Sequence, residues 1–260
     1  MAIHQCIEQS PTMEGVYLLS PYMPECTHEE AYLQVRTKED RVMSDDLVNL
    51  LPDLPDGTPH AQEWQLRKQT ANRFCLDLAQ SQTTTRILDL GCGNGWFSAK
   101  MTALPQVYVV GLDLNLPELQ QAQKLFGSPK LTFCYGDILT GLFTPESFDR
   151  VVLNAACQYF PSIEKLVTVL FDVLTPTGEI HILDSPFYES QDVESARKRT
   201  QAYYQQLGHP EMAHYYFHHT FQELAPYSPI YKYRKASIWQ RLLRQNRSQF
   251  PWVVIRKKRE

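Results

Sequence analysis

The stretch Arg86–Phe97, RILDLGCGNGWF, decides the fold of this 260-residue chain. A short apolar run contains Asp89 and is followed by three glycines, Gly91, Gly93 and Gly95. A strand that ends in a glycine-rich turn and continues into a helix places backbone N–H groups beside a ligand. The stretch therefore predicts a strand, a tight turn and a helix at a small-molecule site.

Further strands and helices alternate downstream of this turn. The strand candidates are RILDL, VYVVGLDL, LTFCYGD, FDRVVLNA and GEIHILDS, followed near the end by IYKYR and PWVVIRK. Asn115, with Glu118 three residues later, and Ser162 mark helix starts, and Gly127 marks a helix end. Strands that alternate with helices predict an α/β fold with a mostly parallel sheet.

The chain divides into an N-terminal cap and one large domain. Residues 1–57 are rich in Pro, Asp and Glu with weak periodicity, so we expect short helices and loops outside the sheet. Residues 58–260 form the main domain, with an aromatic and histidine-rich insertion at about 186–228, where we expect substrate-binding elements.

Three helices outside the alternating region are also predicted. The first begins at Pro59, with Thr58 as its N-cap, and packs at the sheet edge. A long polar helix runs from about Gln191 to Leu207, and a last one covers SIWQRLLRQ, residues 237–245.

Composition describes an ordinary globular protein, with 43% hydrophobic and 21% charged residues and a net charge of −4. The six cysteines form no C-x-x-C pair, so we expect neither a metal site nor disulfides. The chain contains neither a secretory leader nor eighteen consecutive apolar residues, so we expect a cytoplasmic protein without a membrane span. From Lys232 onward there are ten Lys or Arg and one acid, which predicts either a solvated helix face or an anion-binding surface.

The spacing of the glycines separates two ligand classes. The dinucleotide turn needs G-x-G-x-x-G, but Trp96 stands where its third glycine would be, which disfavours a nicotinamide-dependent oxidoreductase. The chain instead has G-x-G-x-G preceded by Asp89, and this pattern resembles motif I of the class I S-adenosylmethionine (SAM)-dependent methyltransferases. The resemblance covers about residues 84–185 and, more weakly, the last strand. A tight strand–helix turn can also demand glycine without any ligand.

The resemblance implies a Rossmann-like, seven-stranded, mostly parallel sheet with helices on both faces, SAM as cofactor and S-adenosylhomocysteine (SAH) as product. It assigns the methionine end of SAM to Asp89, the ribose hydroxyls to Asp113 and the adenine amino group to Asp137. The implied cofactor residues are Asp89, Gly91, Cys92, Gly93, Asn94, Asp113, Leu114, Asp137, Ile138 and Asn154. Each aspartate has an alternative role as a turn former or helix cap.

Asn154 and the residues after it resemble motif IV, which flanks the methyl group and the substrate. Enzymes that methylate amino groups of nucleic-acid bases usually have Pro-Pro and an aromatic residue there, whereas this chain has Ala155, Ala156 and Cys157. We therefore do not expect a nucleic-acid substrate. The remaining prediction is in-line methyl transfer to a small-molecule acceptor, a metabolite or natural product, driven by alignment and desolvation.

Acceptor-side residues are predicted from the segments beside motif IV and in the insertion. Tyr159 and Phe160 are candidates for the pocket wall, or else they cover the core. His218 and His219 are candidates for a general base, or else they are packing histidines. Arg67 and Trp64 are candidates to close over the cofactor.

The sequence leaves several alternatives open for the function of the chain and of its basic C-terminal segment. A non-catalytic protein of the same fold could dock RNA or an acidic carrier protein through the basic C-terminal segment. The same segment could guide an acceptor bound to a carrier protein. The acceptor atom (O, N, C or S) and the oligomeric state are left open.

Overall fold

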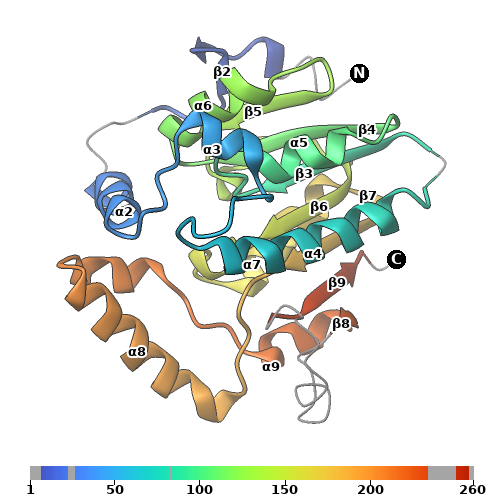
Figure 1. Cartoon of the computed structure of the whole chain (residues 1–260). Helices are drawn as coiled ribbons and strands as arrows, with labels where there is room; N and C mark the ends of the chain where they lie inside the picture. Colours follow the sequence, from blue (N-terminus) through green and yellow to red (C-terminus); the bar gives the residue numbers. More distant parts are fainter. Residues whose placement is uncertain (1–6, 23–26, 82, 234–249, 258–260) are drawn as a thin grey trace.

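The computed structural model describes residues 7–22, 27–81, 83–233 and 250–257. A nine-stranded sheet runs through this part in the order β1-β2-β5-β4-β3-β6-β7-β9-β8 (Figure 1). The strands are β1 (Thr12–Met13), β2 (Val16–Leu18), β3 (Thr85–Leu90), β4 (Val107–Asp113), β5 (Leu131–Tyr135), β6 (Phe148–Asn154), β7 (Leu174–Leu183), β8 (Ile230–Tyr233) and β9 (Trp252–Arg256). The pairs β1–β2, β7–β9 and β8–β9 are antiparallel, and the remaining pairs are parallel. The mostly parallel α/β fold is confirmed, and β3 to β9 correspond to the seven predicted strands.

The N-terminal segment adds the other two strands, so the prediction that residues 1–57 stay outside the sheet was wrong. Glu14 and Gly15 both have positive φ, +48° and +81°, and form the two-residue turn of a hairpin between β1 and β2. β2 then pairs in parallel with β5, and its Val16 is fully buried. Strands of two and three residues are too short to show alternation in the sequence.

Helices cover both faces of the sheet. The helices are α2 (Thr27–Lys38), α3 (Asp45–Leu50), α4 (Ala61–Leu78), α5 (Trp96–Thr102), α6 (Leu116–Phe126), α7 (Ile163–Val173), α8 (Val193–Gln206) and α9 (Phe221–Leu224). α4, α5 and α6 share one apolar cluster with the sheet, and α7 and α9 pack in a second cluster on the opposite face. The predicted caps Asn115 of α6 and Ser162 of α7 are confirmed, since each side chain accepts a backbone N–H.

Two predicted helix details need correction. The helix expected from Pro59 begins at Ala61, because His60 rather than Thr58 is the N-cap. It also lies on a sheet face instead of at the edge, since its buried Phe74 and Leu78 pack in the cluster that contains Ile87 of β3. The terminal helix predicted at 237–245 lies outside the described residues.

The carboxyl ends of the parallel strands form the functional edge of the sheet. β3 lies between β4 and β6: the chain runs outward from β3 through β4 and β5 on one side, and then crosses to β6 and β7 on the other. Ligands of open α/β sheets bind at such a point. α2 and α8 meet beyond this edge, where Lys38 Nζ donates to the carbonyl of Leu207 at 2.6 Å and the Tyr203 hydroxyl donates to Glu39. The N-terminal cap and the insertion therefore close one side of the site together (Figure 1).

Candidate functional site

The glycine-rich turn joins β3 to α5. Gly91, Gly93 and Gly95 have φ angles of +76°, +51° and +76°, which favour glycine. A Cβ on Gly91 would lie 2.5 Å from the Cβ of Ala156, and a Cβ on Gly95 would clash with a β5 side chain. A Cβ on Gly93 would meet only the flexible carboxylate of Glu118, at 3.2 Å. Two glycines thus allow packing within the chain, and Gly93 is the one whose surroundings leave room for a ligand.

Two acids stand beside the turn. Asp113 ends β4, and its two carboxylate oxygens accept the N–H groups of Gly93 at 2.8 Å and Asn115 at 2.9 Å. Asp89 is 1% exposed and accepts a hydrogen bond from Ser98 Oγ at 2.5 Å. Burial raises the pKa of Asp89 to about 7 and also raises the pKa of Asp113, against the effect of its backbone hydrogen bonds.

Glu118 of α6 is a third acid in this group, and the sequence marks it only as a capping partner. Its N–H does donate to Asn115 Oδ1 at 3.2 Å, as a cap requires. Its carboxylate, however, faces the turn, and burial together with the negative charge of Asp113 raises its pKa to about 7. In the sequence, Glu118 is marked only as an acidic residue in the first turn of the helix that follows Asp113.

This acidic group fits SAM better than a dinucleotide. Three carboxylates lie close together with raised pKa values, so a cationic ligand would stabilise their charged forms. SAM brings a sulfonium and an ammonium to such a site, whereas the pyrophosphate of a dinucleotide would add negative charge. Asp89, Asp113 and Glu118 would hold the cofactor there.

The other predicted cofactor residues line the same edge of the sheet. Cys92 is buried, which raises the pKa of its thiol, and Asn94 Oδ1 accepts the N–H of Trp96 at 3.5 Å. Leu114 follows Asp113 and is 45% exposed, so its apolar side chain is open to contact a ring.

Asp137 and Ile138 follow β5. Asp137 caps the short 3-10 helix Ile138–Thr140, because its Oδ1 accepts the N–H of Leu139 at 2.9 Å. Ile138 is 1% exposed and packs in the core cluster beside α7. Helix capping was the alternative to a cofactor contact for Asp137. The cap is present, and it occupies one of the two carboxylate oxygens.

Asn154 ends β6, between the glycine turn and the acceptor side. Its Oδ1 is buried and has no hydrogen-bond partner among the described residues. The chain then turns sharply at Ala155, with φ +55°, and Gln158 Nε2 donates to the Ala155 carbonyl at 2.6 Å. A buried acceptor atom without a donor is costly unless a ligand supplies one.

A cavity of about 420 Å³ opens beside this turn, between α2, α4, α8 and the segment after β6. Four arginines and two glutamates line it: Arg36, Arg41, Arg67, Arg199, Glu39 and Glu63. Of these six residues, only Arg67 was predicted from the sequence. The others come from segments with no recognisable motif, and only the fold brings them together.

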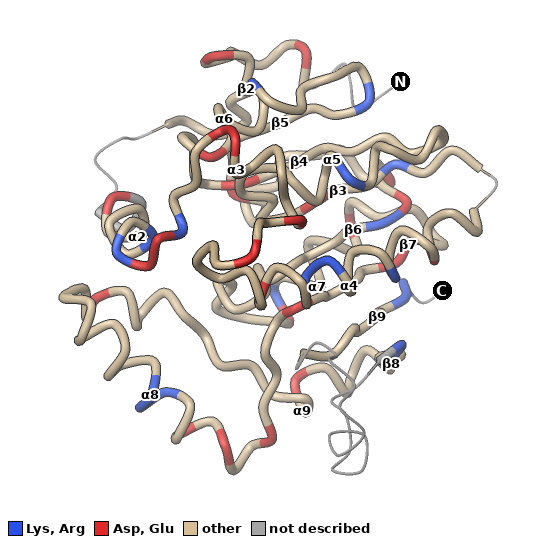
Figure 2. The backbone as a smooth tube through the Cα atoms, in the orientation of Figure 1, with Lys and Arg blue, Asp and Glu red and all other residues tan. Residues whose placement is uncertain are grey.

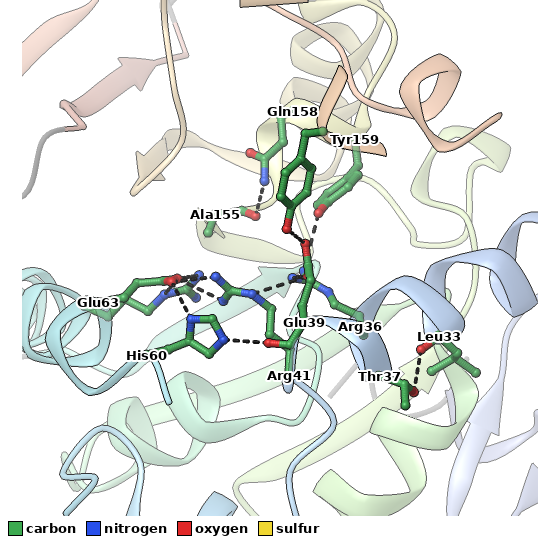
Figure 3. Close-up of polar contacts among 12 residues, drawn as sticks. Leu33, Arg36, Thr37, Glu39, Arg41, His60, Glu63, Ala155, Gln158 and Tyr159 are labelled. Atoms are coloured by element: carbon green, nitrogen blue, oxygen red, sulfur yellow. Dashed lines mark hydrogen bonds and ion pairs between the residues drawn. The ribbon is translucent and has the colours of Figure 1, made fainter. Parts of the chain in front are cut away.

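Ion pairs organise one wall of the cavity (Figure 3). Arg41 donates to both oxygens of Glu63, at 3.1 and 2.6 Å, and Arg67 donates to Glu63 Oε1 at 3.0 and 2.7 Å. Although burial opposes the shift, these two arginines lower the pKa of Glu63 to about 2. Glu39 is shared between Arg36 at 3.3 Å and Arg41 at 3.4 Å.

Arg67 and Trp64 were predicted to close over the cofactor. The Arg67 guanidinium lies over the Trp64 ring at 5.0 Å, and Trp64 packs edge-on against Trp96 at 5.3 Å. Trp96 is thus buried against α4, at the position where a dinucleotide-binding turn has its third glycine.

Tyrosines form much of the remaining wall: Tyr32, Tyr159, Tyr203, Tyr204 and Tyr216. Tyr159 contacts Tyr32 and Tyr216 edge-on, with each pair of ring centroids 6.0 Å apart. Phe160, the neighbouring candidate, packs against the core cluster instead and is not among the residues that line the cavity.

The two candidate histidines have different surroundings. His219 is 3% exposed, and its ring nitrogens lie 3.1 Å from Glu223 and 2.9 Å from the Phe160 carbonyl, so both are occupied away from the cavity. His218 Nε2 lies 2.9 Å from the hydroxyl of Thr200, which lines the cavity. Burial lowers the pKa of His218, and nearby Arg197 adds to this. The structure thus brings His218, but not His219, next to the cavity wall.

Other predictions concern metals, membranes and the basic C-terminal segment. Within the described ranges, no group of three His, Cys, Asp or Glu residues is arranged to hold a metal ion. Nor is any described helix both long and apolar enough to span a bilayer. Lys232 pairs with Asp77 and Arg256 with Glu179, whereas most of the basic segment lies outside the described residues.

Comparisons with known proteins agree with this geometry. A family model described as a methyltransferase domain matches residues 81–247. An uncharacterized methyltransferase of Mycobacterium bovis is 30% identical over 109 residues, 42% of this chain and 54% of the relative. A malonyl-[acyl-carrier protein] O-methyltransferase of Erwinia pyrifoliae is 33% identical over 149 residues, 56% of this chain and 52% of that protein. The chain thus spans about half the length of these curated relatives.

Solved structures share the fold. A SAM-dependent methyltransferase of Methanosarcina mazei superposes with a TM-score of 0.50 and 20% identity, covering 71% of this chain and 98% of that one. The CurJ carbon methyltransferase gives a TM-score of 0.57 and 14% identity, covering 88% of this chain and 67% of that one. Together with the family model and the acid-lined glycine turn, these matches show that the chain belongs to the class I SAM-dependent methyltransferases.

Proposed function

We propose that this chain transfers the methyl group of SAM to a small-molecule acceptor bound in the cavity between α2, α4 and α8. One observation carries the proposal: the wall of the cavity continues directly from the glycine turn. Ala155 and Gln158 line the cavity, and Ala156 between them packs against Gly91. The cofactor edge and the acceptor cavity therefore share one short segment after β6.

SAM, when bound, supplies an activated methyl group on a sulfonium. The chain has to hold the acceptor in line with that methyl group and exclude water. Asp113 and Asp89 would hold the ribose and the ammonium, Asp137 the adenine, and Asn154 would offer its free Oδ1 beside the reacting centre. Ile138 is buried in the core cluster and is not open to contact the ring. Tyr159 would wall the acceptor.

A proton can leave the acceptor through Thr200 and His218. The hydroxyl of Thr200 lies at the cavity, 2.9 Å from His218 Nε2, and His218 also hydrogen-bonds to the Ala196 backbone. The ring N–H of His218 is directed to the Ala196 backbone. Nε2 therefore carries no proton and can accept a hydrogen bond from the Thr200 hydroxyl. The lowered pKa keeps this imidazole neutral, as a base must be. We do not carry His219 forward, because both of its ring nitrogens are occupied.

The proposed transfer is tested by following a labelled methyl group. The purified chain is incubated with [methyl-³H]SAM and a cell extract that has been separated into molecules below about 1 kDa, proteins and RNA. We expect label in the small-molecule fraction with matching formation of SAH. Label confined to RNA, or no transfer in the presence of bound SAM, would contradict the proposal.

A carrier-bound acceptor is a second outcome of the same experiment. The relatives named malonyl-[acyl-carrier protein] O-methyltransferase support it. Label would then appear in the protein fraction and move to the small-molecule fraction after hydroxylamine cleaves the thioester. Label that stays on protein after this treatment would point to methylation of the protein itself and would count against a small acceptor.

A further inference from the structure

We infer that the methyl acceptor is an anion, bound through a carboxylate or phosphate group between Arg36 of α2 and Arg199 of α8. The inference rests on the proposed function, since it takes the cavity to be the acceptor site. It goes further by naming the chemical class of the acceptor and the two residues that select it. Figure 2 shows basic residues on both helices.

The charges that line the cavity do not balance. Arg36, Arg41, Arg67 and Arg199 line it with only two carboxylates, Glu39 and Glu63, although the charges of Asp113 and Glu118 on the cofactor side also act on Arg36. Positive charge in a partly enclosed space attracts an anion from solution and holds it more strongly than an exposed charge would.

The two glutamates are already used within the chain. Glu63 accepts from Arg41 and Arg67 through both of its oxygens. One oxygen of Glu39 accepts a hydrogen bond from the Tyr203 hydroxyl. The other oxygen lies within ion-pair distance of Arg36 and Arg41. Arg41 and Arg67 thus each direct two donor atoms at Glu63, whereas Arg36 has a single, longer contact to Glu39.

Arg36 and Arg199 keep donor capacity for a ligand. Arg36 has one contact to Glu39 at 3.3 Å and a long one to the Tyr159 hydroxyl at 3.4 Å, while its guanidinium lies over the Tyr32 ring. Arg199 is exposed, donates to Ser195 Oγ at 2.9 Å and forms no ion pair with a carboxylate in the part of the chain that the structure describes. Each guanidinium has five N–H donors, so both can grip an oxyanion.

The tyrosines favour the same ligand. Burial raises the pKa of Tyr32, Tyr204 and Tyr216, and burial with Glu39 raises that of Tyr203 to about 12. These phenols therefore stay neutral and add no competing negative charge; Tyr203 gives its single O–H to Glu39, which leaves Tyr204 and Tyr216 as possible donors to a ligand.

The test compares each anion with a neutral counterpart: benzamide has nearly the shape of benzoate, and phenol is phenyl phosphate without its phosphate group. SAH-saturated protein is titrated calorimetrically with benzoate against benzamide, and with phenyl phosphate against phenol. We expect at least one anion to bind about tenfold or more tightly than its neutral counterpart. Arg36→Met and Arg199→Met should each remove that preference. Lys198→Met is the control on the same helix, because Lys198 is exposed, pairs with Glu194 and does not line the cavity.

Each other outcome overturns the inference. Equal binding of anion and neutral partner, or no binding of either, rules out an anion site in this cavity. A preference that survives both substitutions places the anion elsewhere. If Arg36→Met weakens SAH binding itself and leaves the preference intact, Arg36 serves the cofactor carboxylate. The SAH titration that precedes each run tells failure of the methyltransferase proposal apart from failure of the anion site.

Discussion

The two halves of the site have opposite charge and different origins in the sequence. The cofactor half is acidic, with Asp89, Asp113 and Glu118 around the glycine turn, and the pKa of each is raised chiefly by burial. The acceptor half is basic, with four arginines around two glutamates. The difference fits the roles proposed above, an acidic half for a sulfonium donor and a basic half for an anionic acceptor, with the segment after β6 between them.

The largest expected effect is on the acidic half. In Asp113→Asn, an amide NH2 must face the N–H of either Gly93 or Asn115, both of which now donate to the carboxylate. We expect SAH affinity to fall about 100-fold, about 3 kcal/mol, by calorimetric titration. Asp172→Asn, on the exposed surface of α7, should leave the affinity unchanged. An unchanged affinity in Asp113→Asn would remove this acid from the cofactor site.

The second prediction separates stability from binding at Glu118. Its folded pKa of about 7 lies above the usual value of 4.5, so the ligand-free protein loses stability as pH rises from about 4.5 to 7. Glu118→Gln should therefore raise the free energy of unfolding at pH 8 by on the order of 1–2 kcal/mol, with little gain at pH 4.5. Urea unfolding at the two pH values measures this. An equal change in the free energy of unfolding at both pH values would mean that the charge of Glu118 does not cause the change.

The third prediction uses the charge difference between SAM and SAH. Both ligands carry the ammonium, but only SAM carries the sulfonium, so SAM gains more than SAH when Asp89 and Glu118 ionise near pH 7. The preference for SAM over SAH should grow about three- to tenfold between pH 6 and pH 8. Titrations of both ligands at both pH values give the ratio. If the ratio of SAM affinity to SAH affinity does not change with pH, Asp89 and Glu118 do not interact with the sulfonium.

The smallest effect is expected in the basic half. The folded pKa of Glu63, about 2, lies below the usual 4.5, so its ion pairs contribute stability above pH 4.5 and lose it as pH falls through about 2. The side chain is 34% exposed, which weakens this contribution. Glu63→Gln should cost about 1 kcal/mol at pH 7. Glu194→Gln, in the exposed pair with Lys198, should cost less, and an equal cost would make Glu63 an ordinary surface pair.

The cofactor half could be predicted from sequence because its residues follow strand ends. Asp89, Asp113 and Asp137 each stand at a fixed place in a local strand-and-turn pattern, and parallel strands bring those places to one edge. Glu118 was missed because its position also satisfies a helix cap. The seven core strands were predicted for the same local reason, whereas the short hairpin of β1 and β2 gave no periodic signal.

The acceptor half could not be predicted because its contacts are long-range. Arg36 and Arg199 lie on helices that are far apart in the sequence, and neither helix contains a motif that predicts a contact with the other. Only the packing of α2 against the region of α8, through Lys38 and Tyr203, brings them to one cavity. His219 looked like a base in the sequence, but its neighbours Glu223 and Phe160 occupy its nitrogens.

The most direct test of the account is calorimetric titration of the purified chain with SAM, SAH and NADH. The acidic glycine turn predicts binding of SAM and SAH at micromolar concentration and no binding of NADH. Binding of NADH, or failure of both sulfur ligands to bind, would contradict the assignment of the acidic half to a sulfonium cofactor.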